Sequence, residues 1–309
     1  MARAFVIFLR LTAAVAASGA FVALHAQTAA QGAVHDYATS REEYDAMLKA
    51  ANGGTKLDPA HLPDWTGIWS RSDKKIFAFD QNSKQRPGDP QHWETTAQLT
   101  PPYRQAYEKK FQDIKEGKDW DRLSWCLPAG YPRWLAEPWL RDFVVTPNET
   151  WLTHEQINET RRIYTDGRGH VPDKDAIPLW LGDSIGFWDG DTLVIHTNHL
   201  KAGQYQRGNP DYSFNTSTVE RMRKISPNEI EDRVTIYDPD SLIKPWHAVF
   251  HYTKMTQDVR LNYAACEENN NTFRNPDGTS NERLPGEPGY RDGATFGIPE
   301  VAYGSIPKQ

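Results

Sequence analysis

The sequence predicts a mainly β protein whose strands form an antiparallel sheet, arranged either as a closed up-and-down barrel or as a sandwich. From Arg141 onward, apolar and polar residues alternate with a period of two, as in strands with one buried face. Turn residues separate these segments, and no helical pattern lies between them. Because parallel strands need long crossover connections, usually helices, the pattern excludes a parallel βαβ sheet.

The chain of 309 residues is long enough to bury a substantial core. Only 38% of the residues are hydrophobic, but 11 Trp, 13 Tyr and 12 Phe supply large apolar side chains. This aromatic content, without a sustained repeat, excludes a fully disordered chain, a collagen and a coiled coil. The net charge of −6 does not suggest a basic face, so we expect no nucleic-acid partner.

Residues 1–26 have the pattern of a cleavable signal peptide. Arg3 and Arg10 precede or border the uncharged run at 11–24, and the small residues that follow place cleavage near Ala26. The alternative is a membrane anchor, but the run is shorter than the ~20 residues that a spanning helix needs. No cysteine for lipid attachment follows the run. We therefore expect a periplasmic or secreted protein without a stable membrane anchor after processing.

Two helices are expected before the main run of strands. Ser40 begins a Ser-Arg-Glu-Glu capping box, which predicts a helix that ends near Gly53. Thr100 and Pro101 begin a second helix. We assign residues 27–60 to an N-terminal helical extension, 61–269 to the β domain with the helix near 101–116, and 270–309 to a C-terminal coil tail.

The strands are read from the alternating segments and the turns between them. The clearest signal is the hairpin at 188–195, where Asp189 and Gly190 suit the positive φ angles of a type I′ turn. Strands are expected at 64–69, 141–146, 150–154, 158–165, 182–189, 191–198, 216–225, 229–238, 246–255 and 259–266.

The two cysteines, Cys126 and Cys266, are expected to form a disulfide if the chain is exported. The bridge would close a loop of about 140 residues, which corresponds to ~4–5 kcal/mol in the loop-entropy model. The alternative is two buried free thiols. Neither cysteine has a partner at the spacing of a metal site.

A candidate catalytic cluster follows one of the expected strands and consists of Tyr164, Asp166, Arg168 and His170. Strand ends present side chains at the rim of a rigid scaffold, where binding and catalysis often occur. A histidine near a carboxylate can act as a general base or acid. The alternative is an exposed turn, in which Asp166 caps its own turn and Arg168 pairs with an acid.

Three further side chains are candidate catalytic groups: His196, His199 and Glu220. Residues three apart on a strand point to opposite faces, so the two histidines are not expected to bind a metal together. We expect one of them to line a cavity. Glu220 is a candidate acid if it points inward, and a surface ion-pair partner if it points outward.

Aromatic side chains of the β region are candidates for a substrate pocket, and the alternative for each is ordinary core packing. The substrate-binding set is Trp180, Trp188, Trp246, Tyr252 and Lys244. The sequence has no G-x-S-x-G elbow, no H-E-x-x-H motif, no phosphate-binding glycine loop and no dinucleotide fingerprint. We therefore expect neither a cofactor nor a metal.

Four motifs together resemble a large family of exported proteins from Gram-negative bacteria, especially sphingomonads and acidobacteria. They are Ile-Tyr-Thr-Asp-Gly-Arg-Gly-His at 163–170, Gly-Asp-Ser-Ile-Gly-Phe-Trp-Asp-Gly-Asp-Thr-Leu-Val at 182–194, Cys-Leu-Pro-Ala-Gly-Tyr-Pro at 126–132 and Cys-Glu-Glu-Asn at 266–269. The resemblance covers residues from about 60 to 270. It implies a barrel similar to those of lipocalins and other calycins, here with two added N-terminal helices and a coil tail.

The resemblance also places the cluster of Tyr164, Asp166, Arg168 and His170 in a shared site. Most members of the family have no assigned activity. The family usually has an acid at the position of His196, so this chain departs from the pattern there. The departure implies a specialised ligand or reaction.

Two functions are consistent with these observations. The first is an exported, metal-independent enzyme that acts by acid–base chemistry on a hydrophobic or aromatic hydroxylated small molecule in a barrel cavity, as a lyase, hydratase, isomerase or lactone hydrolase. The second is a non-catalytic periplasmic carrier of an apolar ligand, as lipocalins are. The sequence does not determine the oligomeric state.

Overall fold

The computed structural model describes residues 36–72, 97–118, 121–156, 159–206, 208–262, 266 and 271–290. The chain divides into two compact units, residues 1–32 and 33–309. All described residues belong to the second unit, so the predicted signal peptide at 1–26 lies outside them.

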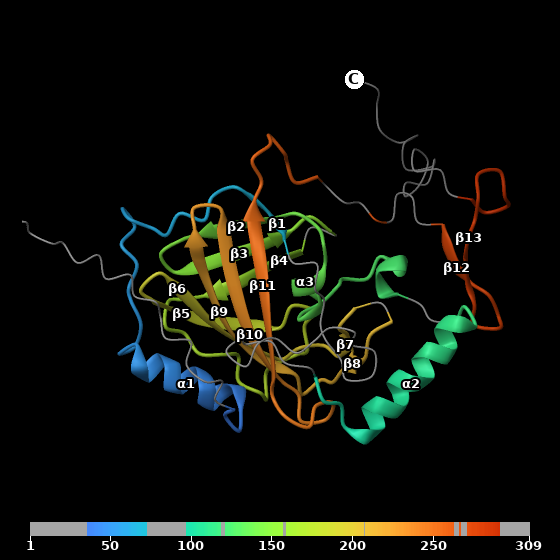
Figure 1. Cartoon of the computed structure of the whole chain (residues 1–309), viewed down its shortest axis with the longest axis horizontal. Helices are drawn as coiled ribbons and strands as arrows, with labels where there is room; N and C mark the ends of the chain where they lie inside the picture. Colours follow the sequence, from blue (N-terminus) through green and yellow to red (C-terminus); the bar gives the residue numbers. More distant parts are fainter. Residues whose placement is uncertain are drawn as a thin grey trace, which may run out of the picture. The chain divides into compact units, whose positions relative to one another are not determined.

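A closed β-barrel forms the body of this unit (Figure 1). Its strands are joined in the order β1-β2-β3-β4-β5-β6-β9-β10-β11, and β11 pairs with β1. Their bounds are Ile68–Arg71 (β1), Arg141–Val145 (β2), Glu149–His154 (β3), Glu159–Tyr164 (β4), Asp183–Asp189 (β5), Thr192–Asn198 (β6), Ser217–Ser226 (β9), Glu229–Tyr237 (β10) and Trp246–Lys254 (β11). The predicted mainly β class is confirmed, and of the two arrangements the sequence allowed, the chain adopts the barrel.

One step of the barrel departs from the up-and-down pattern. Strands β4 and β5 run parallel, with Ile163 opposite Ser184, whereas the other barrel pairs are antiparallel. Parallel neighbours cannot be joined by a tight turn, so the chain crosses between them through the segment 165–182. This crossing carries His170 to the start of β5.

Side chains fill the barrel interior. The short helix α3 (Arg133–Ala136) contributes Trp134, which is fully buried and lies 5.5 Å, ring to ring, from His154. The Arg141 guanidinium donates to the backbone carbonyls of Trp134 and Glu137, each at 2.7 Å. These contacts hold α3 against the inner face of the strands. The surrounding core is apolar and aromatic and includes Trp69, Phe143, Leu193, Phe250 and Tyr252.

The longer helices are α1 (Ser40–Ala50) and α2 (Pro101–Lys115), and a 3₁₀ helix covers Arg122–Trp125. Helix α2 follows β1, so it is inserted in the barrel sequence and does not precede it. The expected capping box is shifted by one residue, because Thr39 is the N-cap and its hydroxyl accepts a bond from Glu42 N. Ser40 is therefore the first helical residue. None of the helices in the described ranges is long and apolar enough to span a membrane.

Two expectations about the C-terminal part are wrong. Residues 259–262, expected to begin a strand, are irregular, and Cys266 lies in a 3₁₀ turn; 263–265 lie outside the described residues. The β1–β11 pair already closes the barrel, so no free edge remains for this segment, and Asn262 N donates to the Glu155 carboxylate instead. The tail expected as coil contains a short ribbon of β12 (Thr272–Arg274) and β13 (Ser280–Glu282).

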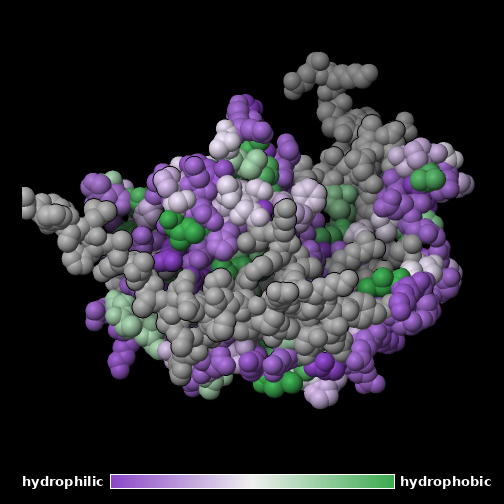
Figure 2. Space-filling view, viewed as in Figure 1, coloured by the Kyte–Doolittle hydropathy of each residue, from purple (hydrophilic) through white to green (hydrophobic). Residues whose placement is uncertain are grey.

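A second short ribbon, of β7 (Gly203–Gln204) and β8 (Asp211–Tyr212), lies between β6 and β9 in the sequence. On the face shown in Figure 2, hydrophilic side chains cover most of the visible described surface, and the hydrophobic patches are separated. The exposed hydrophobic residues include Phe214 and Ile243, both more than half exposed.

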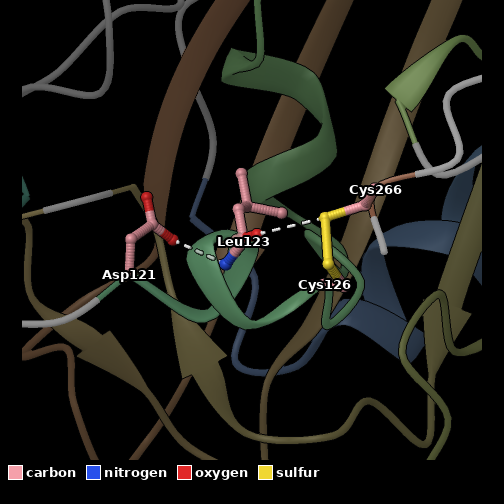
Figure 3. Close-up of a disulfide and its surroundings, with 4 residues drawn as sticks. All are labelled: Asp121, Leu123, Cys126 and Cys266. Atoms are coloured by element: carbon pink, nitrogen blue, oxygen red, sulfur yellow. Dashed lines mark hydrogen bonds between the residues drawn. A yellow bond between two sulfur atoms is a disulfide. The ribbon is translucent and has the colours of Figure 1, made fainter. Parts of the chain in front are cut away.

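The predicted disulfide joins Cys126 and Cys266 (Figure 3), whose Cα atoms are 5.5 Å apart. Cys126 follows the 3₁₀ helix, and Asp121 caps that helix by accepting from Leu123 N at 3.0 Å. The bridge ties this turn to a segment 140 residues later in the chain.

Replacing both cysteines, by Cys126→Ser with Cys266→Ser, should lower the free energy of unfolding by about 4–5 kcal/mol, because the unfolded chain regains the entropy of a long open loop. Urea unfolding of the oxidised protein and of the double variant measures the difference. Equal stability of the two proteins would show that the bridge contributes nothing.

Candidate functional site

Helix α1 lies on the outside of the barrel, over β5, β6, β9 and β10 (Figure 1). Its Tyr44 packs edge-on against Phe187, with ring centroids 5.3 Å apart, and 5.5 Å from the His196 ring. The apolar contact is completed by Met47, Leu48, Ile185, Val194, Val219 and Tyr237. Burial of this patch fixes the first turn of α1 against the outward-facing side chains of β6 and β9.

A continuous series of hydrogen bonds runs through this contact. His170 Nδ1 lies 2.9 Å from Asp183 Oδ2, and His170 Nε2 lies 2.6 Å from His196 Nδ1. His196 Nε2 lies 2.9 Å from Ser40 Oγ, which lies 2.7 Å from Ser217 Oγ. We call these five residues, Asp183, His170, His196, Ser40 and Ser217, the relay.

Donors and acceptors in the relay fit one arrangement in which both imidazoles are neutral. The Asp183 carboxylate can only accept, so His170 Nδ1 carries the proton and donates to it. His170 Nε2 is then free to accept from His196 Nδ1, which leaves His196 Nε2 to accept from the Ser40 hydroxyl. Ser217 completes the series by donating to Ser40 Oγ. Each bond thus sets the tautomer of the next ring.

The relay is mostly shielded from water, and this burial affects the pKa values of His196 and Asp183. His196 is 3% exposed, and burial, followed by the nearby His170, lowers its pKa to about 3. Burial opposes the charge of Asp183, but hydrogen bonds from His170 and from Val171 N outweigh it and lower the pKa of the carboxyl. At neutral pH the relay therefore holds a neutral base at His196 and a carboxylate at Asp183.

The relay ends at a cavity of about 470 Å³ beside the start of α1. Ser40 and Ser217 line it, while His196 lies behind Ser40. The other lining residues are largely apolar, with a few polar groups: Ala38, Thr39, Asn215, Tyr237, Asp238, Pro239, Leu242, Ile243, Lys244 and Pro245. A small molecule in this cavity would meet the Ser40 hydroxyl on a wall that is otherwise mostly hydrophobic.

A second buried polar group fixes α1 next to the relay. The Tyr237 hydroxyl donates to Glu43 Oε2 at 2.9 Å, and the Thr235 hydroxyl lies 3.3 Å from Glu43 Oε1. Burial raises the pKa of Glu43 to about 7, against the opposing effect of the Tyr237 hydrogen bond. Glu43 is therefore partly protonated near neutral pH.

Of the cluster predicted after β4, only His170 belongs to the relay. Asp166 and Arg168 form an exposed ion pair at 2.6 Å, and the Arg168 guanidinium lies 4.1 Å from the centre of the Tyr164 ring. These three residues contact one another in the turn, and Asp166 and Arg168 also line a cavity of about 600 Å³ together with Trp188. His199 lies beside the relay, where its Nε2 is 3.1 Å from the Val171 carbonyl oxygen.

Glu220 points into the barrel, away from the relay. It is fully buried and accepts two hydrogen bonds from the Arg161 guanidinium, which also donates to Thr197. Residue His196, one strand away, points outward from the sheet. The barrel wall therefore separates Glu220 from the two histidines, and its contacts are those of a buried ion pair.

The predicted substrate-binding set is divided among three environments. Trp188, Trp246 and Tyr252 are fully buried in the core. Lys244 is exposed and lines the cavity beside Ser40. Trp180 is half-buried between two cations, with Lys201 Nζ 4.5 Å from the ring centre.

Sequence reasoning missed three members of the relay. Ser40 was interpreted as a helix cap, and Ser217 as an ordinary strand residue. Asp183 lies inside the segment 182–194, which carries the resemblance to a family and the turn expected at Asp189 and Gly190, and no role is predicted there for the Asp183 carboxylate. The barrel register was the signal that could have joined them, because Asp183, His196 and Ser217 all lie on one face of adjacent strands.

Within the described ranges, no three His, Cys, Asp or Glu side chains come together in an arrangement that could hold a metal ion. No family model and no curated protein matches the chain.

Replacing Glu43 by Gln should change how stability depends on pH. The pKa of Glu43 is raised from 4.5 to about 7 by folding, so the native state binds more protons than the unfolded state between these values. As the pH falls from 8 to 4.5, the wild type should therefore gain about 3 kcal/mol relative to Glu43→Gln. Urea unfolding at a series of pH values measures this difference, and a difference that does not vary with pH would contradict it.

Proposed function

We propose that the protein is an exported, metal-independent enzyme that acts by acid–base chemistry on a hydrophobic or aromatic hydroxylated small molecule. The observation that carries the proposal is the relay, which connects a partly buried carboxylate through two imidazoles to a hydroxyl at a cavity. General acid–base catalysis requires a neutral base within hydrogen-bond reach of the proton it takes. His196 Nε2 lies within this reach of the Ser40 hydroxyl.

The relay assigns a role to each group. His196 Nε2 accepts the proton of the Ser40 hydroxyl when the Ser40 oxygen reacts. If a substrate hydroxyl takes the place of Ser40 Oγ, His196 Nε2 accepts the proton of that hydroxyl instead. His170 holds His196 in the required tautomer, and Asp183 holds His170 in the same way. The positive charge that develops on the imidazole pair is stabilised by the Asp183 carboxylate.

The substrate is assigned to the cavity beside α1 and not to the barrel interior. The interior holds Trp134, Arg141 and the Arg161–Glu220 pair, all buried. The cavity wall has Leu242 and Ile243, so it suits an apolar body. The disulfide supports an oxidising compartment, which is consistent with a periplasmic or secreted protein.

A panel of aryl esters and aromatic lactones, with phenyl acetate and dihydrocoumarin among them, tests the proposal in the mature protein. His196→Ala and His170→Ala should each lower kcat/KM by ~10²–10⁴ on any compound that is converted, because each removes the base or the group that orients it. His61→Ala is the matched control, since His61 is an exposed surface residue, and it should leave turnover unchanged.

Unchanged turnover in both relay variants would overturn the assignment. A compound that binds in the cavity and is recovered unaltered, from wild type and variants alike, would support the carrier function instead.

A further inference from the structure

We infer that Ser40 Oγ is a nucleophile that takes up the acyl group of a carboxylic ester or lactone. The inference rests on the proposed function, and it names the reaction class and the substrate class for the same site. Its basis is the position of one oxygen atom, which contacts a base, a second hydroxyl and the cavity.

The first observation is the hydrogen bonding of Ser40 Oγ. Its proton is directed to His196 Nε2 at 2.9 Å, the distance expected between a serine nucleophile and its base. Ser217 donates to the same oxygen at 2.7 Å. Ser40 is only 5% exposed, and the space it faces is the cavity of about 470 Å³. A substrate in the cavity can therefore approach the oxygen while the imidazole stays behind it.

The second observation is the backbone around Ser40. Thr39 is extended and Ser40 begins an eleven-residue helix, so the hydroxyl lies at a sharp change of chain direction. Thr39 already accepts from Glu42 N and Glu43 N through its hydroxyl and carbonyl oxygens. The backbone N–H groups of Ser40 and Arg41 have no acceptor among the described residues.

These two N–H groups belong to the first turn of α1, where the helix dipole favours negative charge. Negative charge that develops on a carbonyl bound to Ser40 Oγ would be favoured by this dipole. The chain lacks a G-x-S-x-G elbow, yet it places a serine at the first position of a helix, within hydrogen-bond distance of a neutral imidazole.

The reaction balances without a metal or a co-reactant other than water. Ser40 Oγ bonds to the substrate carbonyl carbon, and its proton passes to His196 Nε2. The C–O bond to the leaving alcohol then breaks, and the alcohol takes the proton from His196. Water next attacks the acyl-serine, His196 accepts one water proton, and that proton returns to Ser40 Oγ as the carboxylic acid leaves.

A fluorophosphonate probe tests the inference directly, because a serine oxygen with an adjacent base displaces its fluoride and keeps the phosphonyl group. Intact-mass and peptide mapping of the mature protein should find one adduct, on the peptide that contains Ser40. His196→Ala should slow labelling by at least ~100-fold, because the base is lost. Ser226→Ala, which removes an exposed serine on β9, should label at the wild-type rate.

Ser40→Ala should abolish the adduct and the turnover of any converted ester. Its thermal unfolding is measured alongside, and Ser40→Cys, which keeps a nucleophile of similar size, should be alkylated by iodoacetamide at position 40, where the wild-type serine is not. An adduct on another residue, or no adduct on a folded wild type, overturns the inference. If Ser40→Ala keeps an ester turnover that still requires His196, the nucleophile is wrong and the acid–base function stands. If neither Ser40 nor His196 affects turnover, both are wrong.

Discussion

The arrangement of this site depends on the packing of the first turn of α1 against the outside of a closed barrel. Tyr44 anchors the apolar side of that contact, and Glu43 satisfies the polar side through the Tyr237 hydroxyl. The same contact covers His196 and brings Ser40 within 2.9 Å of it. Without α1 in this position, His196 would face water, and its pKa would lose the burial that keeps it neutral.

The barrel acts as the scaffold on which this contact is built. Its interior has its own charged groups, with Arg161 paired to Glu220 inside the wall. Closure fixes the strand neighbours, so that Asp183 on β5, His196 on β6 and Ser217 on β9 lie next to one another on the outer face. The structure thus separates a filled interior, which stabilises the fold, from an outer face where the titratable groups meet.

Much of the fold could be predicted from the sequence, and much of the site could not. The hairpin at 188–195 and the Cys126–Cys266 bridge are both confirmed, but the hairpin turns at Gly190 and Asp191, and of these only Gly190 has a positive φ angle, so the turn is not the type I′ turn expected at Asp189 and Gly190. The parallel β4–β5 step could not be foreseen, because the crossing at 165–182 has no helical pattern to mark it. Which face of a strand points inward also depends on register, and the sequence does not fix the register. Glu220 and His196 are therefore both predicted as catalytic groups, although they lie on opposite sides of the barrel wall.

Nuclear magnetic resonance of the imidazole nitrogens tests the relay most directly. In ¹⁵N-labelled protein, His196 should be neutral at every pH from 7 down to about 4.5, since its pKa lies near 3, and with His170 also neutral its proton should lie on Nδ1. Removal of the Ser40 hydroxyl should shift the His196 Nε2 resonance, because that nitrogen loses its donor. A His196 ring that titrates near pH 6.5, or that carries its proton on Nε2, would contradict the account.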